Sequence, residues 1–215
     1  AWSTSDGQQM LWDAERTPVT MIAYAPFMSE ATPDASLTVN ALTNQSTEEN
    51  VKSSDFLLMK ATVDPEQDLT ADGKLKISLN HAMSKLIIKI TVNGTTDASM
   101  SKLGDMAING AVVNATCDLS AAAPVVVPAA DAVVATVAPY KGTESCECIL
   151  PPQKIAEGFS VNFSYDGKLY IWTAKEAIEL EEGVEHTLTL NVNTTVRLAA
   201  KMARNWATGQ LIDRN

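Results

Sequence analysis

The sequence has few positively charged residues and no cluster of them. It carries 16 Lys and Arg against 26 Asp and Glu, which gives a formal net charge of −10 at pH 7. Tight binding of nucleic acid needs a basic face that displaces counterions from the phosphates. An anionic membrane surface attracts the same kind of face. The composition therefore argues against nucleic acid and against anionic lipid as partners.

Long apolar runs are also missing. A helix needs about 18 consecutive apolar residues to be a candidate for spanning a bilayer. The longest apolar stretch, residues 121–138, is interrupted by Pro124, Pro128 and Asp131. We therefore expect no transmembrane span. The sequence starts at Ala1 without an initiator Met or an apolar leader, so we expect a mature or trimmed product whose export signal has been removed.

Sequence motifs for catalysis and for cofactor binding are absent. The chain contains no G-x-S-x-G, no H-E-x-x-H, no P-loop and no dinucleotide-binding glycine pattern. Its two histidines, His81 and His186, lie far apart in the sequence, and we interpret both as packed, hydrogen-bonded residues. The sequence thus predicts a protein that is not an enzyme and that needs no cofactor.

Cysteine is scarce, with only Cys117, Cys146 and Cys148. On a strand, residues two apart have Cα atoms about 6.5 to 7 Å from each other, which is at the edge of disulfide reach, so a bridge from Cys117 to one of the other two is easier. Three reduced, partly buried thiols are the alternative, and both remain open. Zinc-type spacing is absent, so we expect no metal site.

The most informative stretch is residues 74–92, which alternates between apolar and polar residues with a period of two. This period indicates a strand with one buried face. Apolar residues occupy odd positions up to Leu79 and even positions from Leu86 onward. Because a one-residue slip turns the apolar set toward solvent, we predict a bulge or bend between His81 and Lys85. The predicted core and bend residues are Leu79, His81, Met83, Leu86, Ile88 and Ile90.

Short strands separated by turn signals predict an all-β sandwich for the rest of the chain. The 215 residues suit one large domain or two small ones. Residues 44–54 read as a polar loop, and residues 106–113 read as a short hairpin around Asn109-Gly110. Further expected strands cover residues 19–27, 55–63, 159–165, 168–173, 184–192 and 196–206.

Several stretches, in order, resemble the fimbrillin-like (Mfa-like, type V pilus) proteins of Bacteroides and Porphyromonas relatives. The most specific is residues 79–86, LNHAMSKL, which is similar to the family's F-x-H-x-(L/M)-(A/S)-K-(L/I) signature. Residues 19–26 (VTMIAYAP) and 54–61 (SDFLLMKA) resemble two further family segments, and residues 180–186 (LEEGVEH) fit the start of its closing strand. The resemblance covers most of residues 12–206.

This resemblance implies two transthyretin-like antiparallel β-sandwich domains in series, which we place at residues 1–73 and 74–215. It also implies an exported lipoprotein at the cell surface, associated with the outer membrane or with a fimbrium. In this family a neighbouring subunit supplies an extended strand to a groove, so the implied partners are other fimbrial subunits. The alternative function is a surface-anchored binding module for a glycan or a host protein.

The two ends of the chain are the expected contacts between subunits. Both have isolated apolar residues but no alternation that completes a strand pair, and such ends either fray or pair with another chain. We expect Arg16, just before the first strand, to be a protease site. The residues of interest at the ends are Trp2, Trp12, Arg16, Leu211 and Ile212.

Overall fold

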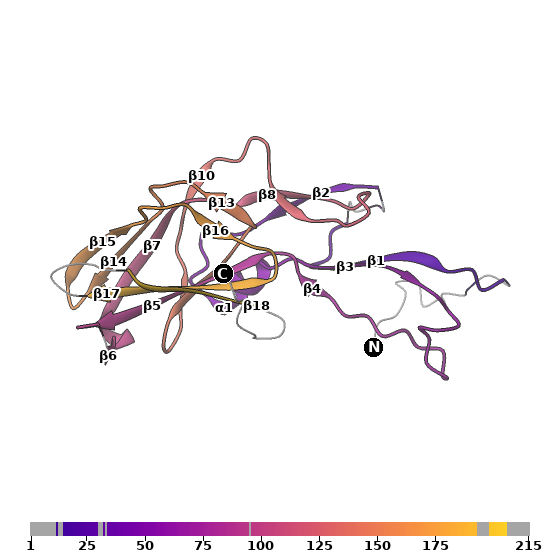
Figure 1. The fold of residues 1–215 in the computed structure, drawn as a ribbon, viewed down its shortest axis with the longest axis horizontal. Coiled ribbons are helices and arrows are strands. Elements are labelled where there is room, and N and C mark those ends of the chain that lie inside the picture. Colours follow the sequence, from indigo (N-terminus) through magenta and orange to yellow (C-terminus); the bar gives the residue numbers. More distant parts are fainter. Residues whose placement is uncertain are drawn as a thin grey trace.

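The regular secondary structure of the described residues is almost entirely β-strand, which confirms the all-β prediction (Figure 1). A computed structural model describes residues 12, 15–29, 32, 34–94, 96–192 and 198–205. In the described part of the chain, no helix reaches the length and apolar character that crossing a membrane requires. The elements are β1 (Val19–Ala25), β2 (Ser36–Asn40), α1 (Glu48–Ser53), β3 (Leu57–Val63), β4 (Asn80–His81), β5 (Ser84–Val92), β6 (Thr96–Asp97), the 3-10 helix η1 (Met100–Lys102), β7 (Leu103–Val112), β8 (Asn114–Asp118), β9 (Val126–Pro128), β10 (Val134–Val137), β11 (Tyr140–Lys141), β12 (Cys146–Leu150), β13 (Gln153–Ile155), β14 (Ser160–Tyr165), β15 (Lys168–Thr173), β16 (Ile178–Leu180), β17 (Val184–Val192) and β18 (Leu198–Asn205).

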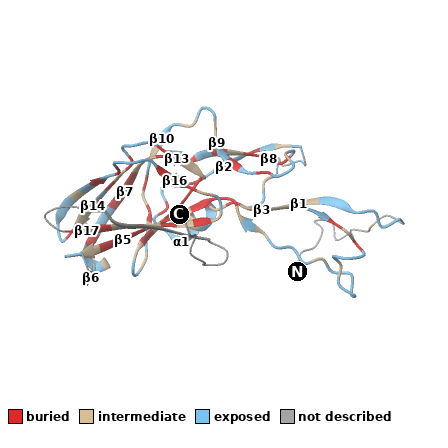
Figure 2. Ribbon diagram, in the orientation of Figure 1, coloured by how far each residue is buried: buried red, intermediate tan, exposed pale blue. Residues whose placement is uncertain are grey.

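Two sheets form the body of the molecule. One has the strand order β11-β12-β5-β17-β18, with β6 paired to β5, and the other has the order β10-β7-β14-β15. Buried side chains from both sheets, such as Ile88 and Leu190 from the first and Ile108 and Val161 from the second, belong to one hydrophobic cluster. Figure 2 shows buried segments of several strands gathered in the body. Burial of this shared apolar face is the main stabilising term of the fold.

A smaller sheet, β2-β8-β9, adjoins the body, and a two-stranded sheet, β13-β16, lies near it. The third part is a projecting sheet of β1, β3 and β4, which we call the arm (Figure 1). In the arm, β1 pairs antiparallel with β3 from Val19↔Val63 to Ala25↔Leu57. The arm is mostly exposed or half-buried (Figure 2), because few elements cover its faces.

Strand β5 lies inside the six-stranded sheet, with β12 antiparallel on one side and β17 parallel on the other. Its even-numbered residues Leu86, Ile88 and Ile90 are buried, as the alternation of the sequence requires. The parallel pairing with β17 was not expected from the sequence. It makes this sheet mixed rather than purely antiparallel.

The chain is irregular between His81 and Lys85, where the phase slip predicted a bend. β4 ends at His81 and β5 begins at Ser84, with the buried residues Ala82 and Met83 between them. Because β4 pairs with β3 and β5 pairs with β12 and β17, this short passage takes the chain from the arm into the body.

The strand expected over residues 74–79 is wrong. Regular pairing begins only at Asn80; Leu75 and Leu79 are half-buried, and Ile77 is 41% exposed. Alternation alone does not make a strand when no neighbouring strand takes up its hydrogen bonds. Within the described ranges, the pairing of this stretch is limited to an isolated bridge between Leu69 and Leu75.

The hairpin expected over residues 106–113 is also wrong, because β7 runs straight through Asn109 and Gly110. Gly110 has a φ of +97°, and a Cβ added there would lie 3.2 Å from the Cα of Phe159. Opposite this point, the register of β10 against β7 shifts between Ala135 and Thr136. The glycine marks a bulge within a paired strand rather than a turn.

Helix α1 lies in the stretch that we expected to be polar loop. The side chain of Thr47 caps it by accepting a hydrogen bond from the backbone N–H of Asn50. The helix buries none of its residues, so it has no apolar stripe by which a period of 3.6 could have revealed it.

The division into domains at residues 1–73 and 74–215 stays a prediction. Backbone pairing crosses this division, because β2 pairs with β8 from Ser36↔Asp118 to Asn40↔Asn114. Leu37 and Val39 of β2 also belong to the same hydrophobic cluster as the body.

Replacing Ile88 by Ala should lower the free energy of unfolding by about 2 to 5 kcal/mol, because the side chain is buried at the centre of the core. Urea unfolding followed by circular dichroism measures this change. The matched control is Ile171→Ala on β15, where the side chain is 67% exposed and the expected loss is below about 0.5 kcal/mol. Equal losses for the two variants would contradict the assignment of Ile88 to the core.

Candidate functional site

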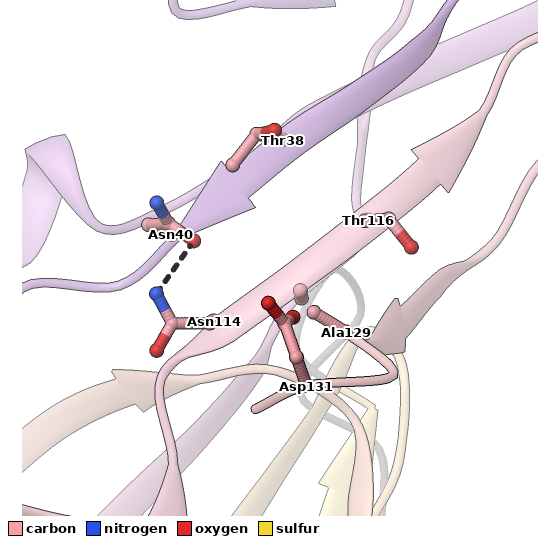
Figure 3. Close-up of a pocket in the computed structure, with 7 residues that line it drawn as sticks. Thr38, Asn40, Asn114, Thr116, Ala129 and Asp131 are labelled. Atoms are coloured by element: carbon pink, nitrogen blue, oxygen red, sulfur yellow. Dashed lines mark hydrogen bonds between the residues drawn. The ribbon is translucent and has the colours of Figure 1, made fainter. Parts of the chain in front are cut away.

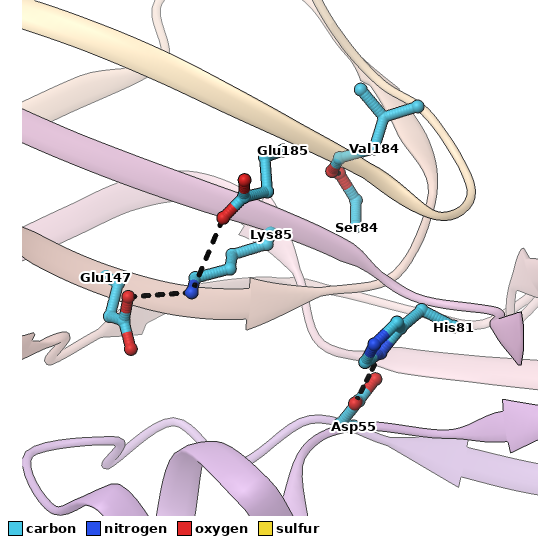
Figure 4. Close-up of polar contacts among 7 residues, drawn as sticks. All are labelled: Asp55, His81, Ser84, Lys85, Glu147, Val184 and Glu185. Atoms are coloured by element: carbon cyan, nitrogen blue, oxygen red, sulfur yellow. Dashed lines mark hydrogen bonds and ion pairs between the residues drawn. The ribbon is translucent and has the colours of Figure 1, made fainter. Parts of the chain in front are cut away.

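The passage between arm and body is held by a pair of polar side chains. His81 of β4 places its Nδ1 atom 2.7 Å from Oδ2 of Asp55, which precedes β3 (Figure 4). Burial raises the pKa of the Asp55 carboxyl, and the charge and hydrogen bond of His81 oppose this rise. The other carboxylate oxygen, Oδ1, is buried without a hydrogen-bond partner in the described part of the chain. The pair therefore links β3 to β4.

The position of Ser84 argues against a catalytic role for this pair. Its hydroxyl donates a hydrogen bond to the carbonyl of Val184, 3.4 Å away. Figure 4 shows the serine pointing toward Val184 and the imidazole of His81 pointing toward Asp55. Ser84 is therefore not placed for activation by His81, although the three residue types would suit a catalytic triad.

An ion-pair network crosses the three central strands of the six-stranded sheet. The Nζ atom of Lys85 on β5 lies 2.8 Å from Oε2 of Glu147 on β12 and 3.5 Å from Oε1 of Glu185 on β17 (Figure 4). All three side chains are less than a third exposed. A single exposed pair contributes only about 0 to 1 kcal/mol. Lys85 can make both ion pairs only when β12 lies on one side of β5 and β17 on the other. The two ion pairs therefore favour this order of strands in the sheet.

His186 is a buried structural residue. Its Nε2 atom accepts a hydrogen bond of 3.0 Å from the backbone N–H of Glu181, in the turn before β17. His81 and His186 are thus both engaged in hydrogen bonds, as predicted from the sequence. Groups of three or more His, Cys, Asp or Glu side chains suited to a metal ion do not occur among the described residues.

The side-chain amides of two glutamines each hydrogen-bond both backbone groups of one strand residue, as the peptide group of a neighbouring strand would. Gln45 is fully buried; its Nε2 donates to the carbonyl of Ile149 and its Oε1 accepts from the N–H of Ile149, both at 2.8 Å. Gln153 makes the same pair of contacts with Val112, both at 2.9 Å. Each amide satisfies a donor and an acceptor that the adjoining strand leaves unpaired. Sequence reasoning missed both, since glutamine in a polar stretch gives no periodic signal.

The three cysteines are free thiols, and all are buried. Of the two alternatives that the sequence left open, the structure has the reduced one. Burial raises the pKa of Cys117 and of Cys146 to about 11, and burial likewise raises the pKa of Cys148. A thiol with a raised pKa stays protonated and is a poor nucleophile. These residues pack the core and carry no chemistry.

The candidate interface is the free edge of β1. In the part of the chain that the structure describes, β1 pairs only with β3. Residues 21–25, with the sequence MIAYA, are all half-buried, so apolar side chains lie on both faces of this edge strand. Strand β5, in contrast, has neighbours on both sides, and residues 86–92 offer no open edge.

The structure places the remaining predicted site residues as follows. Met83, Leu86, Ile88 and Ile90 are buried, whereas Leu79 and His81 are half-buried. Trp12 is half-buried, and its indole N–H donates to the carbonyl of Thr17 at 2.6 Å, while Arg16 is exposed. Trp2, Leu211 and Ile212 lie outside the described residues.

Comparisons with known proteins identify a family and similar folds. The profile of a family described as fimbrillin-like matches residues 1–205. Among curated proteins none matches. A candidate cell adhesion protein from Bacteroides uniformis is similar in structure, with a TM-score of 0.69 and 18% identity over 94% of this chain and 78% of that one. A second, from Bacteroides ovatus, has a TM-score of 0.65 and 15% identity over 100% of this chain and 74% of that one. At these low sequence identities, the structural similarity establishes a shared fold only.

The buried thiols should react with a thiol reagent such as Ellman's reagent only when the protein unfolds, and reductant should leave the melting temperature unchanged. Between about pH 9 and 11 the unfolded thiols ionise while the folded ones stay protonated, so the free energy of unfolding should fall as pH rises through this range. Cys117→Ala should make the fall shallower. Rapid labelling of the native protein at pH 8 would contradict this account.

Proposed function

This chain belongs to the fimbrillin-like family, and from that premise we propose that it is a structural subunit or anchor of a surface fibre that joins its neighbours by β-strand addition. A fimbrial or adhesive structural role fits a chain whose histidines and cysteines are engaged in packing rather than chemistry. We place it at the cell surface, exported and associated with the outer membrane or with a fimbrium.

The observation that carries the proposal is the open edge of β1. Backbone N–H and C=O groups along one side of an edge strand pair readily with another extended chain. Both faces of the strand carry half-buried apolar side chains, Met21 and Ala23 on one face and Ile22 and Tyr24 on the other. An incoming strand would therefore find apolar neighbours for both sets of its alternating side chains.

Strand β15 is another edge strand with exposed apolar residues, and it suits strand addition less well. Leu169 is 85% and Ile171 is 67% exposed, so the outer face of this strand has little cover. A strand added there would bury side chains on the inner face only. The edge of β1 also belongs to the arm, which projects from the body and is accessible to a neighbour (Figure 1).

A lysine placed on the edge of β1 should prevent strand addition, because a charge in the new pairing surface must be desolvated. We expect Ala23→Lys to stay folded and to lose the concentration-dependent, SDS-resistant oligomers of the parent chain. Size-exclusion chromatography and SDS gels without boiling measure this. Ile171→Lys on β15 is the matched control, and it should assemble like the parent.

The control also separates the alternatives. Loss of oligomers in Ile171→Lys but not in Ala23→Lys would move the interface to β15. A parent chain that stays monomeric at high concentration and binds one ligand saturably would favour the rival function, a surface-anchored binding module for a glycan or a host protein.

The ends of the chain provide a second, independent test. Arg16 is exposed just ahead of β1, so limited trypsin digestion should cut after it and separate β1 from residues 1–16. We expect the cut chain to form more oligomers. Removing residues 207–215 should leave a folded protein that no longer donates a strand. If neither change alters association, the ends take no part in assembly.

A further inference from the structure

The outer face of the β2–β8 sheet carries a groove of polar residues outside the surfaces already described (Figure 3). Its volume is about 370 Å³, within the range of small-ligand sites. The residues that line it are Thr38, Asn40, Asn114, Ala115, Thr116, Ala129 and Asp131.

The position of the groove is fixed by the sheet beneath it. β2 and β8 pair in a regular register that sets Thr38 opposite Thr116 and Asn40 opposite Asn114. The alternate residues of the same strands, such as Val39 and Cys117, are buried in the core. Because side chains alternate along a strand, this burial forces the polar pairs outward together. A site on paired strands is held more rigidly than one on a loop.

The polar groups of the groove form a set of donors and acceptors without a positive charge. Asn114 donates from Nδ2 to Oδ1 of Asn40 at 3.3 Å, which orients the two amides with respect to each other (Figure 3). Asp131, in the loop after β9, adds a carboxylate at the margin, and both threonines add hydroxyls. Amides, hydroxyls and a carboxylate together offer both acceptors and donors to neighbouring hydroxyl groups of a ligand.

The same inventory excludes other classes of ligand. No Lys or Arg lines the groove, and the chain has a net charge of −10, so phosphate, sulfate and acidic sugars would meet repulsion from Asp131 without compensation. A calcium ion needs several charged or carbonyl oxygens around it. Here the lining supplies one carboxylate and the amide oxygens of Asn40 and Asn114, the first of which already accepts from Asn114, and this is fewer than the roughly six to eight oxygens that calcium takes.

Apolar surface lies directly beside the polar row. Ala129 lines the groove, and Val127 of β9 pairs with Thr116 and is 47% exposed. A sugar ring has a hydroxyl-bearing edge and a face of C–H groups, so it matches a polar row next to an aliphatic strip. We propose that this groove binds a neutral saccharide, with Asn40, Asn114 and Asp131 holding its hydroxyls and Val127 with Ala129 packing against its C–H face. This inference is independent of strand addition.

An array of immobilised neutral oligosaccharides, printed beside sialylated and sulfated forms of the same chains, tests the proposal with the full-length protein. We expect binding to at least one neutral oligosaccharide and weaker binding to its acidic forms. Asn114→Ala and Asp131→Ala should each lower the affinity for that oligosaccharide by about tenfold or more, because each removes hydrogen bonds to the sugar. Asn162→Ala is the matched control, since Asn162 is an exposed asparagine on the strand β14 of another sheet.

Thermal melts show whether each variant is folded, and Asp131→Asn, which keeps the shape of the side chain, provides a second variant at that position. No binding to any neutral oligosaccharide, a preference for the acidic forms, or unchanged binding in both Asn114→Ala and Asp131→Ala would overturn the proposal. Ala23→Lys distinguishes this site from assembly, since it should lose oligomers and keep saccharide binding. The proposal would also be overturned if Ala23→Lys were the one variant that lost saccharide binding.

Discussion

The two-sided pairing of β5 is the constraint on which the rest of the structure depends. Its backbone is shared between an antiparallel neighbour, β12, and a parallel neighbour, β17, while its even side chains fill the core. Lys85, on the outer face, bridges to acids on both neighbours and so favours this order of strands. β12 and β17 in turn carry the elements next to them, because Gln45 holds the chain before α1 to β12 and β18 pairs with β17.

The body also determines the position of the arm, because the two are joined by a very short connection. The chain leaves β4, crosses the buried residues Ala82 and Met83, and enters β5 at once, so the arm begins three residues from the centre of the main sheet. The chain between β4 and β5 packs closely against Gly183, which precedes β17. The N–H of Gly183 donates to the carbonyl of Met83, and a Cβ on Gly183 would lie 3.1 Å from the carbonyl oxygen of His81. A strand added to β1 would therefore attach to a sheet that is anchored in the core.

The two proposed surfaces belong to different sheets. Strand addition concerns the edge of β1 that no described strand pairs with, whereas the saccharide groove concerns the outer face of β2 and β8, where paired strands present side chains. Backbone pairing tolerates many sequences and gives affinity, while fixed side chains give selectivity for a ligand. A surface protein that uses both can assemble and adhere through separate contacts.

The sequence alone determined the local features that follow from periodicity and turn chemistry. The alternation of Leu86, Ile88 and Ile90 predicted their burial, and the phase slip predicted the irregularity after His81. The strand that ends at Tyr165 and the strand that begins at Lys168 also followed from local signals. Such features depend on residues close together in the chain, so one sequence is enough to predict them.

Only the tertiary structure decided what each segment pairs with. Residues 74–79 alternate as well as β5 does, yet among the described residues they make only one bridge, because none of the described strands runs beside them. Asn109-Gly110 predicted a turn, but pairing with the neighbours β10 and β14 made Gly110 part of a bulge instead. The parallel pairing of β17 with β5, the pairing of β1 with β3 and the meeting of Asn40 with Asn114 join residues between about 30 and 100 positions apart in the chain. Periodicity carries no information about such distant partners, because it records which face of a strand is buried and not what lies beside its edge.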